Sequence, residues 1–298
     1  MRNLTLKQLR YFEALAQHGH FGRAAHACSI SQPALSVQIR ELEETVGTEL
    51  FERSARQVRL TNFGEEFATR ARGILRSVDE LGELARASRD QLVGRLRIGV
   101  IPTIAPYLLP DIITKLTAAN SNIEIQIRES LTPILVRELA DGLLDAAIVA
   151  LPVSEPSLTE IALFEEKFVL VRPVGDENKP VPDHEDLREM KLLLLEEGHC
   201  FRDQALSFCN IQSTRPREML DASSLATLVQ MVGAGLGVTL IPEMAIPVET
   251  RSAPVSIAHF KTPQPSRTIG MIWRKTSPLA KQLLQISEVV REATEAIK

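Results

Sequence analysis

Two cysteines set nine residues apart carry the strongest chemical signal in the sequence, in the segment EEGHCFRDQALSFC. Cys200 follows an apolar run, where a helix should begin, and His199 and Arg202 flank it. A helix N-terminus and nearby cations both favour the thiolate, which is the nucleophilic form of cysteine. An accessible thiolate of low pKa can attack a peroxide and become a sulfenic acid, which Cys209 could convert to a disulfide.

A disulfide between these two positions would require a change of structure. If the intervening residues are helical, nine steps of about 1.5 Å place the positions roughly 13 Å apart, whereas the Cα atoms of a disulfide lie within about 7 Å. Oxidation would therefore unwind or move the helix, as a two-state sensor requires. Two buried cysteines that act only as apolar side chains fit the same residues, and the sequence leaves both interpretations open. Cys28, on the apolar face of a short helix, is expected to be a buried structural residue.

The elements that must position Cys200 and Cys209 follow an α/β pattern from Gly94 onward. Strands and helices alternate as RLRIGVI, a helix at 102–119, IEIQIRE, a helix at 132–144 and DAAIVAL. A second set follows, with FVLVRP, LLLLEE, a helix at Cys200, a helix at 223–234 and VTLIP, before the strand TIGMIW and a helix from about Pro278. This alternation predicts a parallel sheet with helices on its faces, in two lobes with a ligand-binding cleft between them.

The first 60 residues predict a winged helix-turn-helix. Thr5 can cap a first helix, a short second helix follows His18-Gly19-His20, and Ser31 can cap a third helix with Pro33 in its first turn. The third helix buries a stripe at 4, 3, 4 spacing and ends at Gly47. The segment LFERSARQVRL then alternates apolar and basic residues around a polar turn, which indicates a two-stranded wing.

A long helix should run from Thr61 to about Leu92. Its apolar positions repeat as heptads at Phe67, Ala71, Ile74, Val78, Leu81, Ala85, Ser88 and Leu92, which predicts a contact with a second copy of the chain. The alternative is an amphipathic helix that lies on its own domain. We therefore expect a DNA-binding domain at 1–60, a linker and dimerisation helix at 61–92, and an effector domain at 93–298, with lobe I at about 93–165 plus 269–298 and lobe II at about 166–268.

The third helix is the candidate for contacts with DNA bases, because a helix fits the major groove. Pro33, Ser36, Val37 and Arg40 lie opposite its apolar stripe, with Gln32 at its start. The wing carries Arg53 and Arg56, which could pair with phosphates or enter the minor groove. Residues 1–76 hold 11 Lys and Arg against 8 Asp and Glu, a balance of +3, so with a total of −4 the rest carries −7. That asymmetry is compatible with a DNA-binding head on an acidic body.

Several classes of protein are disfavoured by what the sequence lacks. No run approaches 18 apolar residues, and the N-terminus lacks the pattern of a signal peptide, so we expect a cytoplasmic protein without a membrane segment. Histidines are few and no CxxC pair is present, so no metal or other cofactor is expected. No GxSxG, HExxH or Walker sequence occurs, which argues against an enzyme. A thiol peroxidase remains the enzyme alternative, and it predicts multiple turnover with a thiol reductant and no sequence-specific DNA binding.

The segment FGRAAHACSISQPALSVQIRELEETVGTELFERSARQVRLTNFG resembles the DNA-binding segment of LysR-type transcriptional regulators over 44 residues. The resemblance implies a periplasmic-binding-protein-like effector domain, a homodimer through the long helix that often pairs into a homotetramer, and promoter DNA and RNA polymerase as partners. It places DNA contacts on Ser31, Gln32, Pro33, Ser36, Arg53 and Arg56.

The segment GHCFRDQALSFC, together with IGVIPTIAPYLLP and SRTIG, resembles the redox-active parts of the hydrogen-peroxide sensors of that family. The resemblance implies that peroxide oxidises Cys200, that Cys209 resolves it, that a thiol reductant resets the disulfide, and that oxidative-stress genes are activated. Some relatives carry a His ten residues after the second cysteine, where this chain has Met219, so that role does not transfer. A LysR-type regulator that responds to a small metabolite in the cleft is the alternative. The implied peroxide pocket comprises Thr103, Thr132, His199, Arg202, Asp203 and Arg267.

Overall fold

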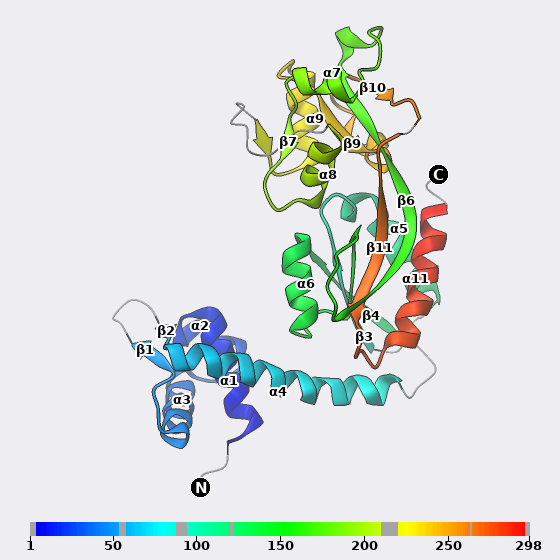
Figure 1. The fold of residues 1–298 in the computed structure, drawn as a ribbon. Coiled ribbons are helices and arrows are strands. Elements are labelled where there is room, and N and C mark those ends of the chain that lie inside the picture. The colour runs from blue at the N-terminus through cyan, green and yellow to red at the C-terminus, as the bar shows by residue number, and fades with distance from the viewer. Residues whose placement is uncertain are drawn as a thin grey trace. The chain divides into compact units, whose positions relative to one another are not determined.

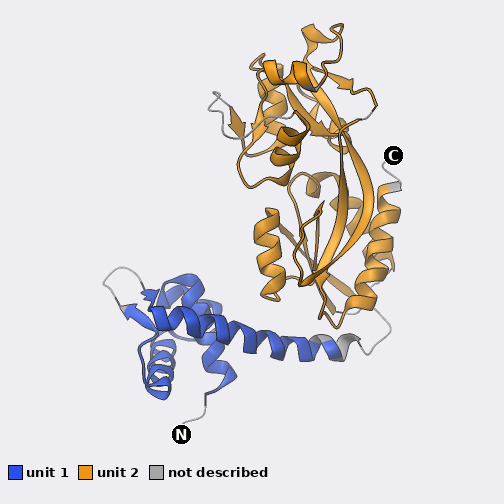
Figure 2. Cartoon of the chain, in the orientation of Figure 1, with its two compact units in different colours: residues 1–85 blue, residues 86–298 orange. Residues whose placement is uncertain are grey.

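In the computed structural model, the chain divides into two compact units, residues 1–85 and residues 86–298 (Figure 2). The structure describes residues 4–53, 58–87, 94–119, 122–209, 220–262 and 264–295. Each unit contains hydrophobic core of its own. Within the described ranges, no helix is long and apolar enough to cross a membrane.

Helix caps set the limits of the three helices that open the first unit. Thr5 accepts a hydrogen bond at the start of α1, and Ser31 accepts one from the Ala34 N–H at the start of α3. Gly19 and Gly47 end α1 and α3 with φ of +57° and +76°, a conformation that glycine adopts without strain. These helices, which pack over a core that includes Phe12, Leu35, Ile39 and Leu42, are α1 (Leu6–His18), α2 (Phe21–Ala27) and α3 (Gln32–Val46).

A two-stranded antiparallel wing and a long helix complete the first unit. The strands are β1 (Phe51–Arg53) and β2 (Val58–Leu60), and the helix is α4 (Asn62–Ala87). Glu43 of α3 accepts hydrogen bonds from the N–H groups of Leu50 and Phe51, which fixes the wing against α3. The apolar stripe of α4 packs against the core at Phe67 and Ala71, but Leu81 further along is 66% exposed. The last part of the long helix expected from the sequence, residues 88–92, lies outside the described residues.

The second unit is built on a mixed sheet with the strand order β10-β6-β11-β5-β3-β4, in which β9 also pairs with β6 (Figure 1). Its strands are β3 (Gly94–Val100), β4 (Ile123–Glu129), β5 (Ala146–Leu151), β6 (Leu158–Pro173), β9 (Thr239–Pro242), β10 (Val255–His259) and β11 (Ser266–Arg274). A separate parallel ribbon joins β7 (Leu194–Leu195) to β8 (Asp221–Ala222). The helices are α5 (Ala105–Ala119), α6 (Thr132–Ala140), α7 (His184–Glu189), α8 (Cys200–Phe208), α9 (Leu225–Gly233), α10 (Ile246–Glu249) and α11 (Ala280–Glu295).

The expectation of a parallel sheet is correct for only part of this sheet. β3 pairs in parallel with β4 and β5, whereas β11 pairs antiparallel with β5 and β6, and β6 pairs antiparallel with β9 and β10. A loop of six residues, 152–157, joins β5 to β6. β11 lies between β5 and β6 and runs antiparallel to both, so β5 and β6 share one direction although only this short loop joins them. The strand expected at 168–173 begins ten residues earlier, at Leu158, and α7 and β10 were not expected.

Two hydrophobic cores lie along the second unit, and β6 contributes to both. The lobe I core includes Leu158 and Leu163 of β6 with α5, α6 and α11, and α6 and α11 lie on opposite sides of the sheet (Figure 1). The lobe II core includes Phe168 and Val171 of β6 with α7, α8 and α9. The boundary between the two cores on β6 lies between Leu163 and Phe168. The exact limits of the two lobes remain a prediction.

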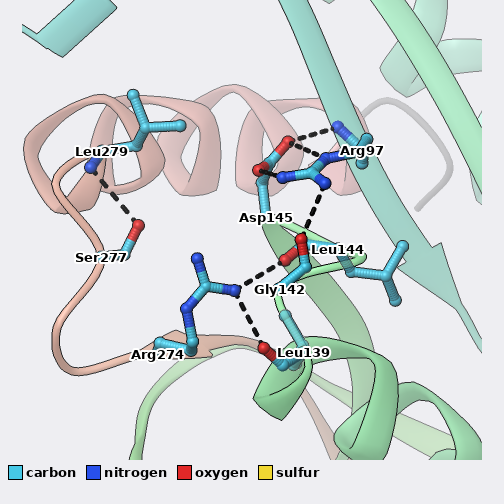
Figure 3. Close-up of polar contacts among 8 residues, drawn as sticks. All are labelled: Arg97, Leu139, Gly142, Leu144, Asp145, Arg274, Ser277 and Leu279. Atoms are coloured by element: carbon cyan, nitrogen blue, oxygen red, sulfur yellow. Dashed lines mark hydrogen bonds and ion pairs between the residues drawn. The ribbon is translucent and has the colours of Figure 1, made fainter. Parts of the chain in front are cut away.

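Buried ionic groups stabilise the loop between α6 and β5 (Figure 3). The Asp145 carboxylate, with no exposed surface, accepts hydrogen bonds from the Arg97 N–H at 2.7 Å and from its guanidinium at 2.6 Å. A second guanidinium, that of Arg274, donates to the carbonyl oxygens of Leu139 and Leu144. Because buried polar groups are costly unless they are paired, these bonds hold α6 in one position, and with it the N-terminus that begins at Thr132.

Candidate functional site

Helix α8 carries both cysteines of the candidate redox site, one at each end. Cys200 is its first residue and Cys209 is its C-cap. A buried face with Phe201 and Ala205 holds the helix on lobe II, and Gly198, with φ of +94°, makes the turn before it. Both thiols are free. Because α8 is helical throughout, its ends are roughly 13 Å apart, so the cysteines cannot be joined without unwinding it.

The two cysteines have different surroundings. Cys200 is half-buried and packs against the lobe I core, whereas Cys209 is 0% exposed within the lobe II core. Burial raises the pKa of the Cys209 thiol to about 11, so Cys209 is protonated at neutral pH. A protonated, fully buried thiol is a poor first nucleophile, which leaves Cys200, at the helix N-terminus, as the candidate for the first attack.

The cations that the sequence places beside Cys200 behave differently from the expectation. Burial lowers the pKa of His199, with a smaller opposing effect of Glu196, so the imidazole is neutral at pH 7. The Arg202 guanidinium donates from Nη1 to the Leu195 carbonyl at 2.6 Å and to the Asp221 carboxylate at 2.7 Å. Arg202 therefore ties α8 to β7 and β8. Asp221 compensates the charge of Arg202 and His199 carries no charge, so the expected pair of cations does not stand beside the Cys200 thiol.

A buried arginine connects three elements around the N-terminus of α8. Arg267 of β11 donates to Thr103 Oγ1 at 2.8 Å and to the Thr103 carbonyl at 3.1 Å. It also donates to the Glu166 carboxylate of β6 at 2.7 Å, and its guanidinium carbon lies 5.1 Å from the centroid of the Phe201 ring. Burial raises the pKa of Glu166, and Arg267 opposes that rise. Arg267 thus joins the loop before α5, strand β6 and helix α8.

The start of α6 lies beside the loop that leads into Cys200. A Cβ atom on Gly198 would lie 3.0 Å from the Cδ1 atom of Leu131, the N-cap of α6. Thr132 is the first residue of α6, and its Oγ1 atom is buried without a hydrogen-bond partner in the described part of the chain. A buried hydroxyl without a partner is unusual, and it suits a small ligand that can donate and accept hydrogen bonds.

The candidate DNA interface is the outer face of α3. Gln32, Pro33 and Arg40 are exposed and Ser36 is half-buried, while the hydroxyl of Ser31 serves as the helix cap. Arg53 lies in β1, but its side chain is outside the described residues, as is the whole of Arg56.

Two family models match this chain. The model described as "Bacterial regulatory helix-turn-helix protein, lysR family" matches residues 6–65, and the one described as "LysR substrate binding domain" matches residues 89–295. The chain belongs to the LysR family. LysR-family membership makes it a DNA-binding transcription regulator and not an enzyme.

Similar LysR-family proteins carry informative names. A "Probable hydrogen peroxide-inducible genes activator" of Streptomyces viridosporus is 42% identical over 98% of this chain and 95% of its own length. The "DNA-binding transcriptional dual regulator OxyR" of Escherichia coli K12 is 40% identical over 97% and 95%. A full-length OxyR variant from Pseudomonas aeruginosa superposes with a TM-score of 0.77 at 38% identity, over 98% of this chain and 96% of that chain. A Corynebacterium glutamicum OxyR mutant described as H2O2-bound gives a TM-score of 0.68 at 35% identity, over 99% and 94%.

The structure brings together only some of the residues expected at the peroxide pocket. Thr103 and Arg267 are in direct contact, and Thr132 and His199 lie on neighbouring segments. Asp203, by contrast, is exposed on α8.

Sequence reasoning missed Glu166 and Gln204. The Gln204 Oε1 atom is buried without a hydrogen-bond partner in the described ranges, one helical turn after Cys200. Its i, i+4 spacing from Cys200 was a signal in the sequence. Glu166 pairs with a residue 101 positions away, and no local pattern indicates such a contact.

Proposed function

We propose that this LysR-family regulator senses hydrogen peroxide with Cys200 and Cys209 and activates oxidative-stress genes in response. The observation that carries the proposal is that one helix separates the two free thiols and places them against different cores. A disulfide requires that helix to unwind, so oxidation would change the conformation of the effector domain. Relatives about 40% identical and described as hydrogen peroxide-inducible genes activators support the same chemistry.

The reaction has two steps. The Cys200 thiolate attacks one oxygen of the peroxide, the O–O bond breaks, and the departing hydroxide takes up a proton to leave as water. The Cys209 sulfur then attacks the Cys200 sulfenic acid, a second water leaves, and the disulfide forms with two electrons transferred to the peroxide. A cellular thiol reductant returns those electrons. The residues proposed to bind the peroxide are Thr103, Thr132, His199 and Arg267, with Arg202 and Asp203 nearby.

The first unit is proposed to bind promoter DNA and to join the copies of the chain. Helix α3 is proposed to enter the major groove of promoter DNA, with contacts from Ser31, Gln32, Pro33, Ser36, Arg40, Arg53 and Arg56. The exposed stripe of α4 is proposed to pair two copies into a dimer, which pairs again into a tetramer that recruits RNA polymerase. Leu81→Asp should then shift the protein toward monomer in analytical ultracentrifugation. A regulator of this kind works where the chromosome is, in the cytoplasm.

Intact-protein mass spectrometry after about one equivalent of hydrogen peroxide tests the proposal. We expect a rapid loss of two hydrogens, mapped by peptide analysis to a Cys200–Cys209 link. Cys200→Ser should abolish it, Cys209→Ser should stop at the sulfenic acid, and Cys28→Ser, the matched control, should behave like the wild type. Free thiols after treatment, or oxidation only at large excess, would refute peroxide sensing.

A response to a small metabolite is the second candidate function. It is favoured by a cavity of about 480 Å³ in the second unit, lined by Leu108, Phe164, Glu166, Met244 and Pro247 among others. That size is within the range of small-molecule sites. Under this hypothesis the Cys200→Ser variant keeps its full transcriptional response, whereas under the peroxide hypothesis it loses it.

A further inference from the structure

Helix α3 carries an apolar strip on the face that points away from the core of the first unit. Val37 is 50% exposed, and Pro33 and Ala34, one turn earlier, are exposed as well. The side chains on the opposite face, Leu35, Ile39 and Leu42, have no exposed surface. The strip therefore lies outside the core that holds the helix in place.

Val37 contributes little to the stability of the helix that carries it. Branching at Cβ restricts its rotamers and lowers its helix propensity, and half of its apolar surface remains in water. An isolated exposed valine is ordinary on a protein surface. Val37 is not isolated, because it adjoins Pro33 and Ala34 and is flanked by the polar side chains of Ser36 and Arg40. Such an apolar strip among polar groups is suited to a partner that presents both kinds of surface.

The major groove of DNA presents such a surface. Each base edge there offers hydrogen-bond donors and acceptors, and thymine alone adds an apolar group, the 5-methyl. In a helix-turn-helix, the residues near the start of the second helix contact these edges. Val37 is the sixth residue of α3, which places it roughly 7.5 Å along the helix from its first residue.

We infer that Val37, with Ala34 beside it, packs on the 5-methyl group of a thymine in each half-site and so selects thymine at that position. The inference rests on the proposed use of α3 as the DNA-contacting helix. Gln32 and Arg40 make hydrogen bonds on either side of this contact, while the valine distinguishes thymine from the other bases by shape and polarity. Loss of the methyl group should weaken binding about fourfold for each thymine, the effect of exposing one buried methyl-sized group.

Chemically altered DNA tests the inference without changing the protein. Sites are first selected from a random duplex pool with the full-length, reduced protein, and a selected duplex is then made with each thymine in turn replaced by deoxyuridine, which lacks only the methyl group. Fluorescence anisotropy should show a loss of about fourfold at one thymine in each half-site and no loss elsewhere. Replacement of the same thymine by 5-bromodeoxyuridine, whose bromine is close to a methyl group in size, should restore binding.

The variant Val37→Ser provides the second arm of the test. It should bind the thymine duplex more weakly than the wild type and should bind the thymine and deoxyuridine duplexes equally well. A wild type indifferent to every deoxyuridine, or a Val37→Ser variant with the same sensitivity as the wild type, overturns the inference while leaving DNA binding intact. Failure of the wild type to select any site overturns the proposed use of α3 as well. Circular dichroism melting confirms that the variant is folded.

Discussion

Replacement of Arg267 by Met should destabilise the second unit by about 3–5 kcal/mol, the usual effect of leaving a buried charge without its partner. The guanidinium of Arg267 and the carboxylate of Glu166 lie 2.6 Å apart, and neither side chain is more than 3% exposed. The substitution also removes the donor to the Thr103 hydroxyl. Methionine fills similar space, so the loss reflects the charge of Glu166 more than a cavity.

The loss should depend on pH. Burial raises the folded-state pKa of Glu166 above its ordinary value of 4.5, Glu243 raises it further, and Arg267 opposes both effects. Without Arg267 the rise is larger. A carboxyl group with a raised folded pKa favours the folded state most below about 4.5, and that contribution is lost as the pH rises through the folded pKa. The loss of stability in the variant should therefore be smaller near pH 5, where it reflects mainly the missing bonds to Thr103, and largest at pH 8.

Trp273 makes this measurement direct, because it is the single tryptophan of the sequence and is buried in the lobe I core. Urea unfolding followed by its fluorescence reports the second unit alone. Adding Glu166→Gln to Arg267→Met should recover most of the loss at pH 8 and remove its pH dependence. The control is Arg128→Met, which breaks a surface pair with Glu138 and should change stability by less than about 1 kcal/mol. A loss that is equal at pH 5 and pH 8, or no recovery in the double variant, would refute the reasoning.

Three further predictions concern the same unit. Asp145→Ala should cost about 3–5 kcal/mol in the same titration, because it leaves the guanidinium of Arg97 without its buried partner (Figure 3); a change below about 1 kcal/mol would contradict this role. Asp221→Asn weakens the bond from Arg202 that ties α8 to β8, so disulfide formation in quenched-flow mass spectrometry should be several-fold faster, and an unchanged rate would show that this tie does not limit unwinding. The rate of the second step, the attack by the Cys209 thiol, should rise with pH; if α8 unwinds first, that rise should level off near the ordinary thiol pKa of about 8.5. A rate that keeps rising toward pH 11, the folded-state pKa of Cys209, would mean that the thiol attacks from the intact helix.

Local signals explain which parts of this fold the sequence could predict. Thr5, Ser31 and Gly47 are cap residues whose chemistry acts within one helical turn, so the limits of α1 and α3 agree with the structure. The start of α8 at Cys200 was also predicted, from the apolar run that ends just before it.

Contacts between distant segments explain most of what could not be predicted. The pattern of β6 is interrupted by polar side chains such as Glu165 and Glu166, whose partners Ser266 and Arg267 lie 101 positions away in the chain. Arg202 lies close to Cys200 in sequence, which suggested a role beside the thiol, but a carboxylate 19 residues away holds its guanidinium. The antiparallel pairing of β11 likewise depends on strands more than 90 residues away in the chain.

The continuity of β6 has a consequence for how LysR-family proteins of this kind can be recombined. A single strand of 16 residues enters both cores, and β11 pairs along much of its length. An exchange of one lobe with a relative would have to join foreign backbone in the middle of two paired strands, where each side chain is matched to its neighbours. The boundary between the two units, by contrast, falls near the end of α4. Chimaeras should therefore tolerate a new DNA-binding head far better than a new lobe, and the two lobes should be inherited together.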